Sequence, residues 1–363
     1  MASAAGPAEE SERRNVSDAT GAIVLGACAV WALIVAGARG GRPEGLLLAV
    51  LAVGAGYASG RISGALLPVA APFVGALAGV GLAAAAPHTT PVPEFGWPLG
   101  QTGATAALLA ISAGAACCAA WSANAPALRF ALRLLAAGIA AAALLLGSTA
   151  GFAACTVILL CSLAAARMHR RGLGLTGLAL ATAVVTGVPW ALAANVLPDG
   201  LSDSLEAQLG PEQVPLWQDA LRLVRDDPAL GVGPGRFEEL SPTVAQSLFP
   251  DTDGKPHSAP LQQAAEQGVV GVVLLAAVFC WLLYTLWRTP RPTPVALSAG
   301  AALAALAAIA SVGNALSFTA VTAGAGLLAG IATSRPLAVE GTQGAAAAEG
   351  SLPEGPVPKG PAP

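Results

Sequence analysis

Charge is what this sequence has least of. Only 11% of its 363 residues are Asp, Glu, Lys or Arg, while 55% are hydrophobic. Soluble domains carry about a quarter charged residues, so this scarcity excludes a soluble globular enzyme. The few charges lie in short clusters between apolar stretches of roughly 16 to 24 residues, the length that a membrane-spanning helix needs. The composition therefore predicts an all-α polytopic membrane protein.

An excess of basic residues is also missing. The chain has 18 Lys and Arg against 21 Asp and Glu, which gives a formal net charge of −3. Binding to nucleic acid through counterion release needs a basic face, and the arginines here are scattered over short loops. The sequence therefore predicts no nucleic-acid partner.

Metal and disulfide patterns are missing too. The three histidines lie far apart, and the six cysteines include neither a CxxC pair nor a Cys/His set, so neither a metal site nor a cofactor is expected. Each cysteine falls in an apolar stretch, where a free thiol behaves as a small hydrophobic residue. The cysteines are Cys28, Cys117, Cys118, Cys155, Cys161 and Cys280.

Hydropathy predicts about ten membrane-spanning helices, an even number that keeps both termini on one side. Their alanine and glycine content favours close helix packing. The least certain features are the short second span and residues 147–149, where one long broken helix could replace two spans. The predicted spans are 21–38, 45–60, 63–86, 102–121, 130–147, 151–166, 173–193, 268–287, 293–312 and 318–333.

The basic residues set the orientation, because cytoplasmic loops carry the excess of Lys and Arg. Starting inside, 12 of the 18 basic residues fall in inner segments. Only Arg39 and Arg42, in a short outer turn, contradict the rule. We therefore expect a multi-pass plasma-membrane protein with both termini cytoplasmic and the long loop extracytoplasmic.

The chain then divides into five segments. The loop at 194–267 has 74 residues and holds 12 of the 21 acidic residues, and the tail is too poor in large apolar residues to order itself. The segments are a disordered cytoplasmic N-terminus (1–20), seven transmembrane helices (21–193), the extracytoplasmic loop (194–267), three more transmembrane helices (268–333) and a disordered cytoplasmic tail (334–363).

Residues 215–225 of the long loop predict a short amphipathic helix, with Trp217, Leu221 and Val224 on one face. Arg222 and Arg225 are three residues apart, so both can face one way and meet phosphate oxygens. The alternative is that these two arginines pair with neighbouring acids or with lipid head groups.

A glycine-rich turn, GVGPGRF, follows at 231–237. Its glycines, among them Gly233 and Gly235, permit positive φ and the close approach of a ligand to the backbone. Arg236 adds a fixed cation on the predicted outer side. Such a turn is more often structural than phosphate-binding when no strand precedes it.

His257 precedes another predicted helix, with Ser258 or Ala259 at the cap and a proline in the first turn. The positive end of a helix disfavours imidazolium and keeps a neutral base available. Glu266 lies more than two helical turns further on, so we expect a structural role for it. His88, in a Pro-rich outer loop (87–101), is expected to be solvated.

These segments resemble a known family. The order WQDALRLVRDDPALGVGPGRF, an acidic stretch, and then HSAPLQQAAEQGVVGVVLL at the start of a span is similar to the O-antigen ligase and O-antigen polymerase superfamily of bacterial envelope glycosyltransferases. The resemblance is best over residues 213–287 and rests elsewhere on topology. Its most specific parts are the Gly-x-Gly-Pro-Gly-x-Phe turn and the histidine that opens a helix with Leu-Gln and Glu-x-Gly.

The resemblance implies a GT-C-like fold that transfers a glycan from a polyprenyl diphosphate carrier to an acceptor hydroxyl, without nucleotide or metal. His257 would then be the catalytic base. Arg236, with Arg222 and Arg225, would bind the diphosphate beside Gly233 and Gly235, and the small-residue spans would form a groove for the lipid. Membrane lipids, the lipid-linked glycan and an acceptor lipid, protein or polysaccharide are the implied partners.

The chain departs from the family at three places. Ser258 stands where the family often has Asn, Gln213 or its neighbours where an arginine often precedes Leu-Trp, and Ser148-Thr149 where a Ser-Arg pair is common. Fewer cations then remain for a diphosphate, which also fits an inactive member.

Two other functions are compatible with the sequence. A transporter or flippase of lipid-linked sugars would also have many spans with small residues. However, no acid lies well inside a predicted span, where coupling-ion sites are expected. A non-catalytic scaffold for envelope assembly is the second alternative.

Overall fold

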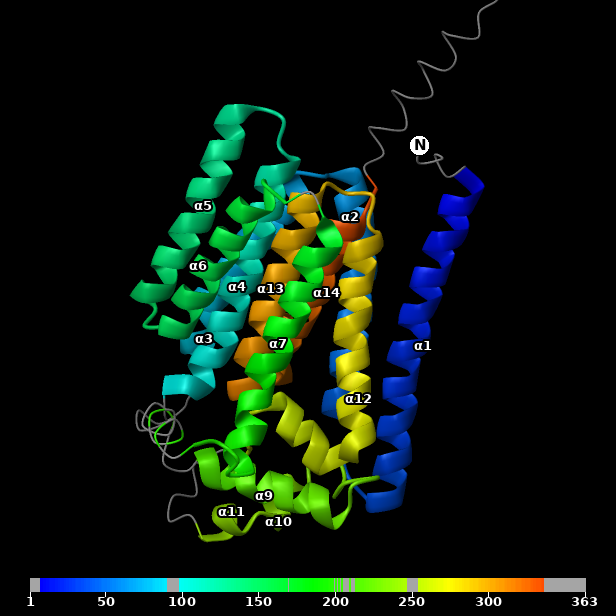
Figure 1. The fold of residues 1–363 in the computed structure, drawn as a ribbon, viewed down its shortest axis with the longest axis vertical. Coiled ribbons are helices and arrows are strands. Elements are labelled where there is room, and N and C mark those ends of the chain that lie inside the picture. Colours follow the sequence, from blue (N-terminus) through cyan, green and yellow to red (C-terminus); the bar gives the residue numbers. More distant parts are fainter. Residues whose placement is uncertain are drawn as a thin grey trace, which may run out of the picture.

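The computed structural model is a bundle of long helices with a small helical layer across one end (Figure 1). The structure describes residues 7–89, 98–168, 170–198, 200, 202, 204, 209, 213–246 and 254–335. Within these, the side chains of 7–15, 86–89, 98–102 and 246 are not described. Residues 336–363 of the predicted tail and the centre of the Pro-rich loop therefore lie outside the described residues.

Ten apolar helices run along the bundle. Seven are long and apolar enough to cross a membrane, and three are shorter apolar helices. The all-α polytopic membrane fold is confirmed, and each predicted span has its helix. The ten are α1 (Pro7–Arg39), α2 (Glu44–Leu66), α3 (Ala70–Thr89), α4 (Pro98–Ser122), α5 (Pro126–Leu145), α6 (Thr149–Ala165), α7 (Arg171–Ala193), α12 (Ala259–Arg288), α13 (Thr293–Val312) and α14 (Thr319–Thr333).

The remaining helices form the layer across one end. They are α9 (Gln213–Asp226), α10 (Phe237–Leu240) and α11 (Pro242–Gln246), and a 3₁₀ turn, η1 (Ala315–Ser317), precedes α14. We call this the loop end. Helix α1 begins and α14 finishes at the opposite end, which we call the terminal end (Figure 1).

Helix boundaries differ from the prediction at the first three spans. The break between α2 and α3 lies at 67–69 rather than between 60 and 63, because Pro68 disfavours helical geometry at Leu67, which has φ −130° and ψ 73°. Helix α1 begins at Pro7, within the segment expected to be disordered. A proline at a helix start, followed by alanine and glutamates, favours this extension.

Residues 146–148 separate α5 from α6, so two helices are present here and not one long broken helix. Gly147 has φ 70°, which ends α5 in the left-handed region. The Ser148 side chain then accepts a hydrogen bond from the Gly151 N–H at 3.1 Å and caps α6. The Ser148 hydroxyl is therefore occupied in helix capping.

Glycines bring α2 and α14 into backbone contact. Gly56 and Gly60 of α2 and Gly326 and Gly330 of α14 face carbonyl oxygens of the partner helix, and a Cβ added at any of them would overlap those oxygens. Small residues four apart are the usual means of close packing between membrane helices. The glycine content thus has a packing role at this interface.

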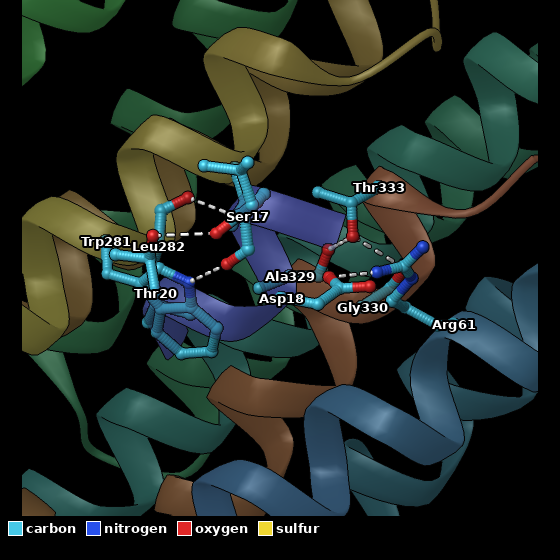
Figure 2. Close-up of polar contacts among 11 residues, drawn as sticks. Ser17, Asp18, Thr20, Arg61, Trp281, Leu282, Ala329, Gly330 and Thr333 are labelled. Atoms are coloured by element: carbon cyan, nitrogen blue, oxygen red, sulfur yellow. Dashed lines mark hydrogen bonds and ion pairs between the residues drawn. The ribbon is translucent and has the colours of Figure 1, made fainter. Parts of the chain in front are cut away.

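Helix α1 is held to the bundle at its terminal end by a few polar contacts (Figure 2). The Arg61 guanidinium of α2 forms an ion pair with Asp18. The indole N–H of Trp281 in α12 donates to the Ser17 carbonyl at 3.1 Å. Gly21 of α1 lies directly against that indole, leaving no room for a side chain. These contacts fix the base of α1 against α2 and α12.

We expect Gly60→Leu to destabilise the protein, because the new side chain would overlap the α14 backbone. Overpacking of this kind costs about 1 to 3 kcal/mol or more. Thermal unfolding of purified protein in detergent would show a lower midpoint and more aggregation. Gly138→Leu is the matched control, since a Cβ at Gly138 meets nothing within 4 Å. Equal unfolding midpoints for the two variants would contradict the close packing of α2 on α14.

Candidate functional site

Helix α9 is anchored at the loop end by its apolar face. Trp217 is fully buried, and its indole N–H donates to the Pro256 carbonyl at 2.6 Å, one residue before His257. The predicted helix at 215–225 is confirmed, although Leu221 is only half-buried. Gln213 is buried and its amide donates to the Val312 carbonyl at 3.1 Å. Gln213 therefore joins α9 to the end of α13. It lies in the stretch where the resembled family often has an arginine.

The glycine-rich turn docks on a break in α12. Gly268 has φ 68° and ψ −170°, which interrupts the helix. The carbonyls of Ala265 and Glu266 instead accept hydrogen bonds from the Val232 N–H (2.9 Å) and the Gly233 N–H (3.0 Å). The turn is thus bonded to α12 through main-chain atoms, in place of helical bonds that the break removes.

Three glycines of the turn have positive φ: Gly231 (64°), Gly233 (105°) and Gly235 (72°). A Cβ at Gly231 would lie 2.5 Å from the Ala265 carbonyl oxygen, and one at Gly233 would lie 2.8 Å from the Arg39 Cβ. Gly231 and Gly233 therefore pack directly against α12 and Arg39, where a larger side chain would not fit. Gly235 has open space beside it.

A second turn, between α1 and α2, packs on the first. The Arg42 N–H donates to the Pro234 carbonyl at 3.0 Å, and the Arg236 guanidinium donates to the Arg39 carbonyl at 2.9 Å. A Cβ at Gly41 would lie 2.5 Å from the Pro234 oxygen, so glycine is required there for this approach. The two turns come from segments almost 200 residues apart in the sequence.

A polar cleft of ≈ 560 Å³ lies where the two turns meet, and we call it the arginine cleft. Arg39 forms an ion pair with Asp227, and the Arg236 Nε lies 3.3 Å from a Glu239 carboxylate oxygen. The cleft is lined by Arg39, Gly40, Gly41, Arg42, Pro234, Gly235, Arg236 and Glu239.

Arg39 and Arg42 were not predicted as site residues. The available signal was their position, because they are the two exceptions to the predicted distribution of basic residues. The structure places both beside Arg236, so the three arginines line the same cleft.

A larger cavity of ≈ 840 Å³, which we call the groove, adjoins the cleft. Its walls are mainly apolar side chains of α1, α2, α7, α12, α13 and α14, such as Leu25, Val50 and Leu275. Polar and charged residues line it near the loop end. They include Arg42, Glu238, Lys255, Gln262, Gln263 and Glu266.

The groove and the cleft share Arg42, Pro234 and Gly235. Glu266 lines the groove and accepts a hydrogen bond from the Gln262 amide at 3.1 Å. The break at Gly268 brings the carbonyl of Glu266 to the glycine-rich turn, so this residue contacts the site through both its backbone and its side chain.

His257 lies beside the groove without lining it. Lys255 and Ala259, on either side of it, are lining residues. His257 is half-buried and has φ 43°, in the left-handed region that few non-glycine residues adopt. Ser258 occupies the N-cap position of α12, as predicted, but its side chain makes no capping bond.

Arg222 and Arg225 lie on the exposed side of α9, and neither lines the groove or the cleft. Asp219, on the same helix, accepts hydrogen bonds from the Ser241 hydroxyl (2.6 Å) and the Thr243 N–H (3.0 Å). Burial acts to raise the pKa of Asp219, but these bonds and the nearby Arg222 outweigh it and hold the pKa below its usual value. Arg222 thus supports a structural carboxylate. The His88 side chain lies outside the described residues.

The Asp219 carboxylate should make the loop end sensitive to acid. Its pKa is lowered in the folded state, so it stabilises the protein above the ordinary aspartate pKa and loses that effect as pH falls through the folded value. We expect Asp219→Asn to lower the unfolding midpoint by a few degrees at pH 7. The difference from wild type should shrink as pH falls below the ordinary aspartate pKa, and a pH-independent difference would contradict the ionic role of Asp219.

A comparison with known proteins matches the part of the chain that contains this site. No curated protein matches the chain in sequence. Residues 134–276 match the family model for O-antigen ligase, a segment that begins within α5 and contains the glycine-rich turn, His257 and Glu266. Over this segment, the chain is similar to the O-antigen ligase family.

Proposed function

We propose that the protein is an integral membrane glycosyltransferase that moves a glycan from a polyprenyl diphosphate carrier to an acceptor hydroxyl. The observation that carries this proposal is the junction of two cavities. An apolar groove between membrane helices opens, at the loop end, into a cleft lined by three arginines. A polyprenyl diphosphate is likewise a long apolar chain with an anionic head group at one end.

The groove suits the lipid portion of such a carrier. Its walls come from six apolar helices, and its charged lining residues lie near the loop end. Ligand sites of this kind bind by apolar contact and orient the ligand through a few polar groups. A polyprenyl chain could lie along α12 with its head group directed toward the loop end.

The arginine cleft suits the diphosphate. Arginine makes paired, charge-assisted hydrogen bonds with phosphate oxygens. Arg236 is held by the Arg39 carbonyl, and its ion pair with Glu239 is exposed and weak. In this proposal, its guanidinium stabilises the negative charge that develops on the leaving diphosphate.

His257 is the proposed base. It would take the proton of the acceptor hydroxyl while the acceptor oxygen forms a bond to the anomeric carbon. The bond from that carbon to the diphosphate breaks, and the diphosphate leaves with the electron pair. Attack opposite the leaving group inverts the anomeric centre, and none of these steps requires a nucleotide or a metal ion.

The position of His257 supports this role in two ways. Its backbone has an uncommon left-handed conformation, and such conformations are concentrated at functional sites. The carbonyl of the preceding residue is held by the buried Trp217. Since His257 stands beside the groove, an acceptor that enters from the loop end would meet it next to the carrier head group.

The proposed setting is the plasma membrane, with both termini cytoplasmic and α9–α11 on the outer face. The acceptor would be a lipid, a protein or a polysaccharide. A ligase would attach a finished glycan, whereas a polymerase would extend a growing one. The length of the product distinguishes these two activities.

The direct test compares wild type, His257→Ala and Arg236→Ala in a strain that lacks the chromosomal copy. Loss of the general base in His257→Ala lowers a rate by about 10²- to 10⁴-fold, and loss of a group that stabilises developing negative charge in Arg236→Ala by about 10²- to 10³-fold. Both variants should therefore accumulate polyprenyl-diphosphate glycan and lose the envelope polymer. Lipid extraction and polysaccharide analysis measure these pools. Arg167→Ala, at an exposed position near the terminal end, is the control for expression. Wild-type polymer from the His257 variant would favour the transporter or scaffold alternatives.

A separate prediction concerns the groove alone. Cys280 is an exposed free thiol that lines the groove, whereas Cys161 is a partly exposed thiol outside it. Glycan-free polyprenyl diphosphate should slow the alkylation of Cys280 by a membrane-permeable maleimide several-fold, because the bound chain would cover the thiol. Peptide mass spectrometry reads each cysteine separately, and Cys161 serves as the internal control. Unchanged labelling at Cys280 would argue against lipid binding in the groove.

A further inference from the structure

Arg42 occupies a special place in this site. It lines both the groove and the arginine cleft, and among the described residues it is the only charged one that the two cavities share. It comes from the turn between α1 and α2, outside the segment that matches the O-antigen ligase family. Nothing in that match therefore assigns it a role.

The charges around the cleft leave Arg42 uncompensated. Arg39 is paired with Asp227, and Arg236 is paired with Glu239. Among the described residues, the Arg42 side chain makes neither an ion pair nor a hydrogen bond. Its guanidinium is therefore available to an incoming anion, whereas the other two arginines each keep a carboxylate partner.

The charges on the groove side differ in sign. Of the described residues that line the groove, Arg42 and Lys255 are the cations, and Glu238 and Glu266 are the acids. An anionic head group would be repelled by these carboxylates and attracted toward the cleft. Arg42 stands at the boundary between the two regions, where an apolar chain in the groove would end and its head group would begin.

The backbone of Arg42 is placed independently of its side chain. Its N–H is bonded to the Pro234 carbonyl, and Gly41 packs against the same residue. The Arg236 guanidinium is bonded to the Arg39 carbonyl in the same turn. Truncation of the Arg42 side chain would therefore leave the two docked turns in place.

From this geometry we infer that Arg42 is a binding residue for the carrier diphosphate, which it holds where the groove opens into the arginine cleft. The inference rests on the proposed function, because it names a residue of the same site. It adds that the α1–α2 turn, as well as the long loop, contacts the substrate.

The test measures binding of glycan-free polyprenyl diphosphate to purified protein in nanodiscs of neutral lipid. Arg42→Ala should weaken binding about tenfold to a hundredfold, as expected for loss of a charge-assisted bond to phosphate. Arg42→Lys should recover part of the lost affinity. The Arg42→Ala change should weaken binding of polyprenyl monophosphate less than binding of the diphosphate. The unfolding midpoint should stay at the wild-type value, and Arg167→Ala should bind as wild type does.

Transfer kinetics give a second measurement. Loss of a ground-state diphosphate contact should raise KM for the donor in Arg42→Ala, whereas loss of the base in His257→Ala should lower kcat with binding retained. Equal affinity of wild type and Arg42→Ala, with His257→Ala inactive, would overturn the role of Arg42 alone. Failure of wild type to bind the diphosphate would overturn both this inference and the proposed function.

A phospholipid head group could also bind Arg42, and the same experiment distinguishes it from the carrier diphosphate. Nanodiscs that contain anionic phospholipid should compete only weakly if the diphosphate is the ligand. Equal binding of phospholipid and polyprenyl diphosphate, lost together in Arg42→Ala, would assign Arg42 to the membrane surface instead and overturn the inference.

Discussion

The break in α12 at Gly268 is the constraint on which the site depends. A continuous helix would use the carbonyls of Ala265 and Glu266 for its own hydrogen bonds. Because the helix is interrupted, these groups are available, and the glycine-rich turn satisfies them with its own N–H groups. A buried carbonyl without a partner is costly, so the break and the turn stabilise each other.

The contact between the glycine-rich turn and α12 also positions the neighbouring parts of the site. The turn presents Pro234 to the α1–α2 turn, and thereby places Arg39, Arg42 and Arg236 around one cleft. The first part of α12, before the break, carries Gln262, Gln263 and Glu266 along the mouth of the groove. One main-chain contact thus aligns an apolar cavity, formed by membrane helices, with a cationic one formed by loops.

Helix α1 closes the side of this arrangement. It is tied to the bundle at the terminal end through Ser17 and Asp18, and at the loop end through the ion pair of Arg39 with Asp227. The indole of Trp31 also donates to the Gln267 carbonyl at 3.2 Å, next to the break. Between these anchors, Leu25 and Cys28 face the groove. The same helix therefore forms a wall of the groove and positions two arginines of the cleft.

Much of the fold could be predicted from sequence. Segments that cross a membrane form their backbone hydrogen bonds within a helix, and such helices are recognisable as long apolar runs. The ends of α2 and α3 were placed wrongly, since hydropathy does not register the effect of Pro68 on the preceding residue. The sequence predicted that the glycines of the turn adopt positive φ, but not which parts of the protein pack against them. Gly231 meets α12, and Gly233 meets Arg39, because pairings across almost 200 residues leave no local pattern. The exceptional positions of Arg39 and Arg42 were visible in the sequence, yet only the structure shows that they share a cleft with Arg236.

The central claim is that a glycan bond is broken and remade at this junction. The most direct measurement supplies purified protein, in proteoliposomes, with a defined polyprenyl-diphosphate glycan and a hydroxyl acceptor, and follows both products by mass spectrometry and NMR. The account predicts one released polyprenyl diphosphate for each glycan transferred, with the anomeric configuration inverted. Movement of the intact lipid-linked glycan across the bilayer, without cleavage of its bond to the diphosphate, would contradict it.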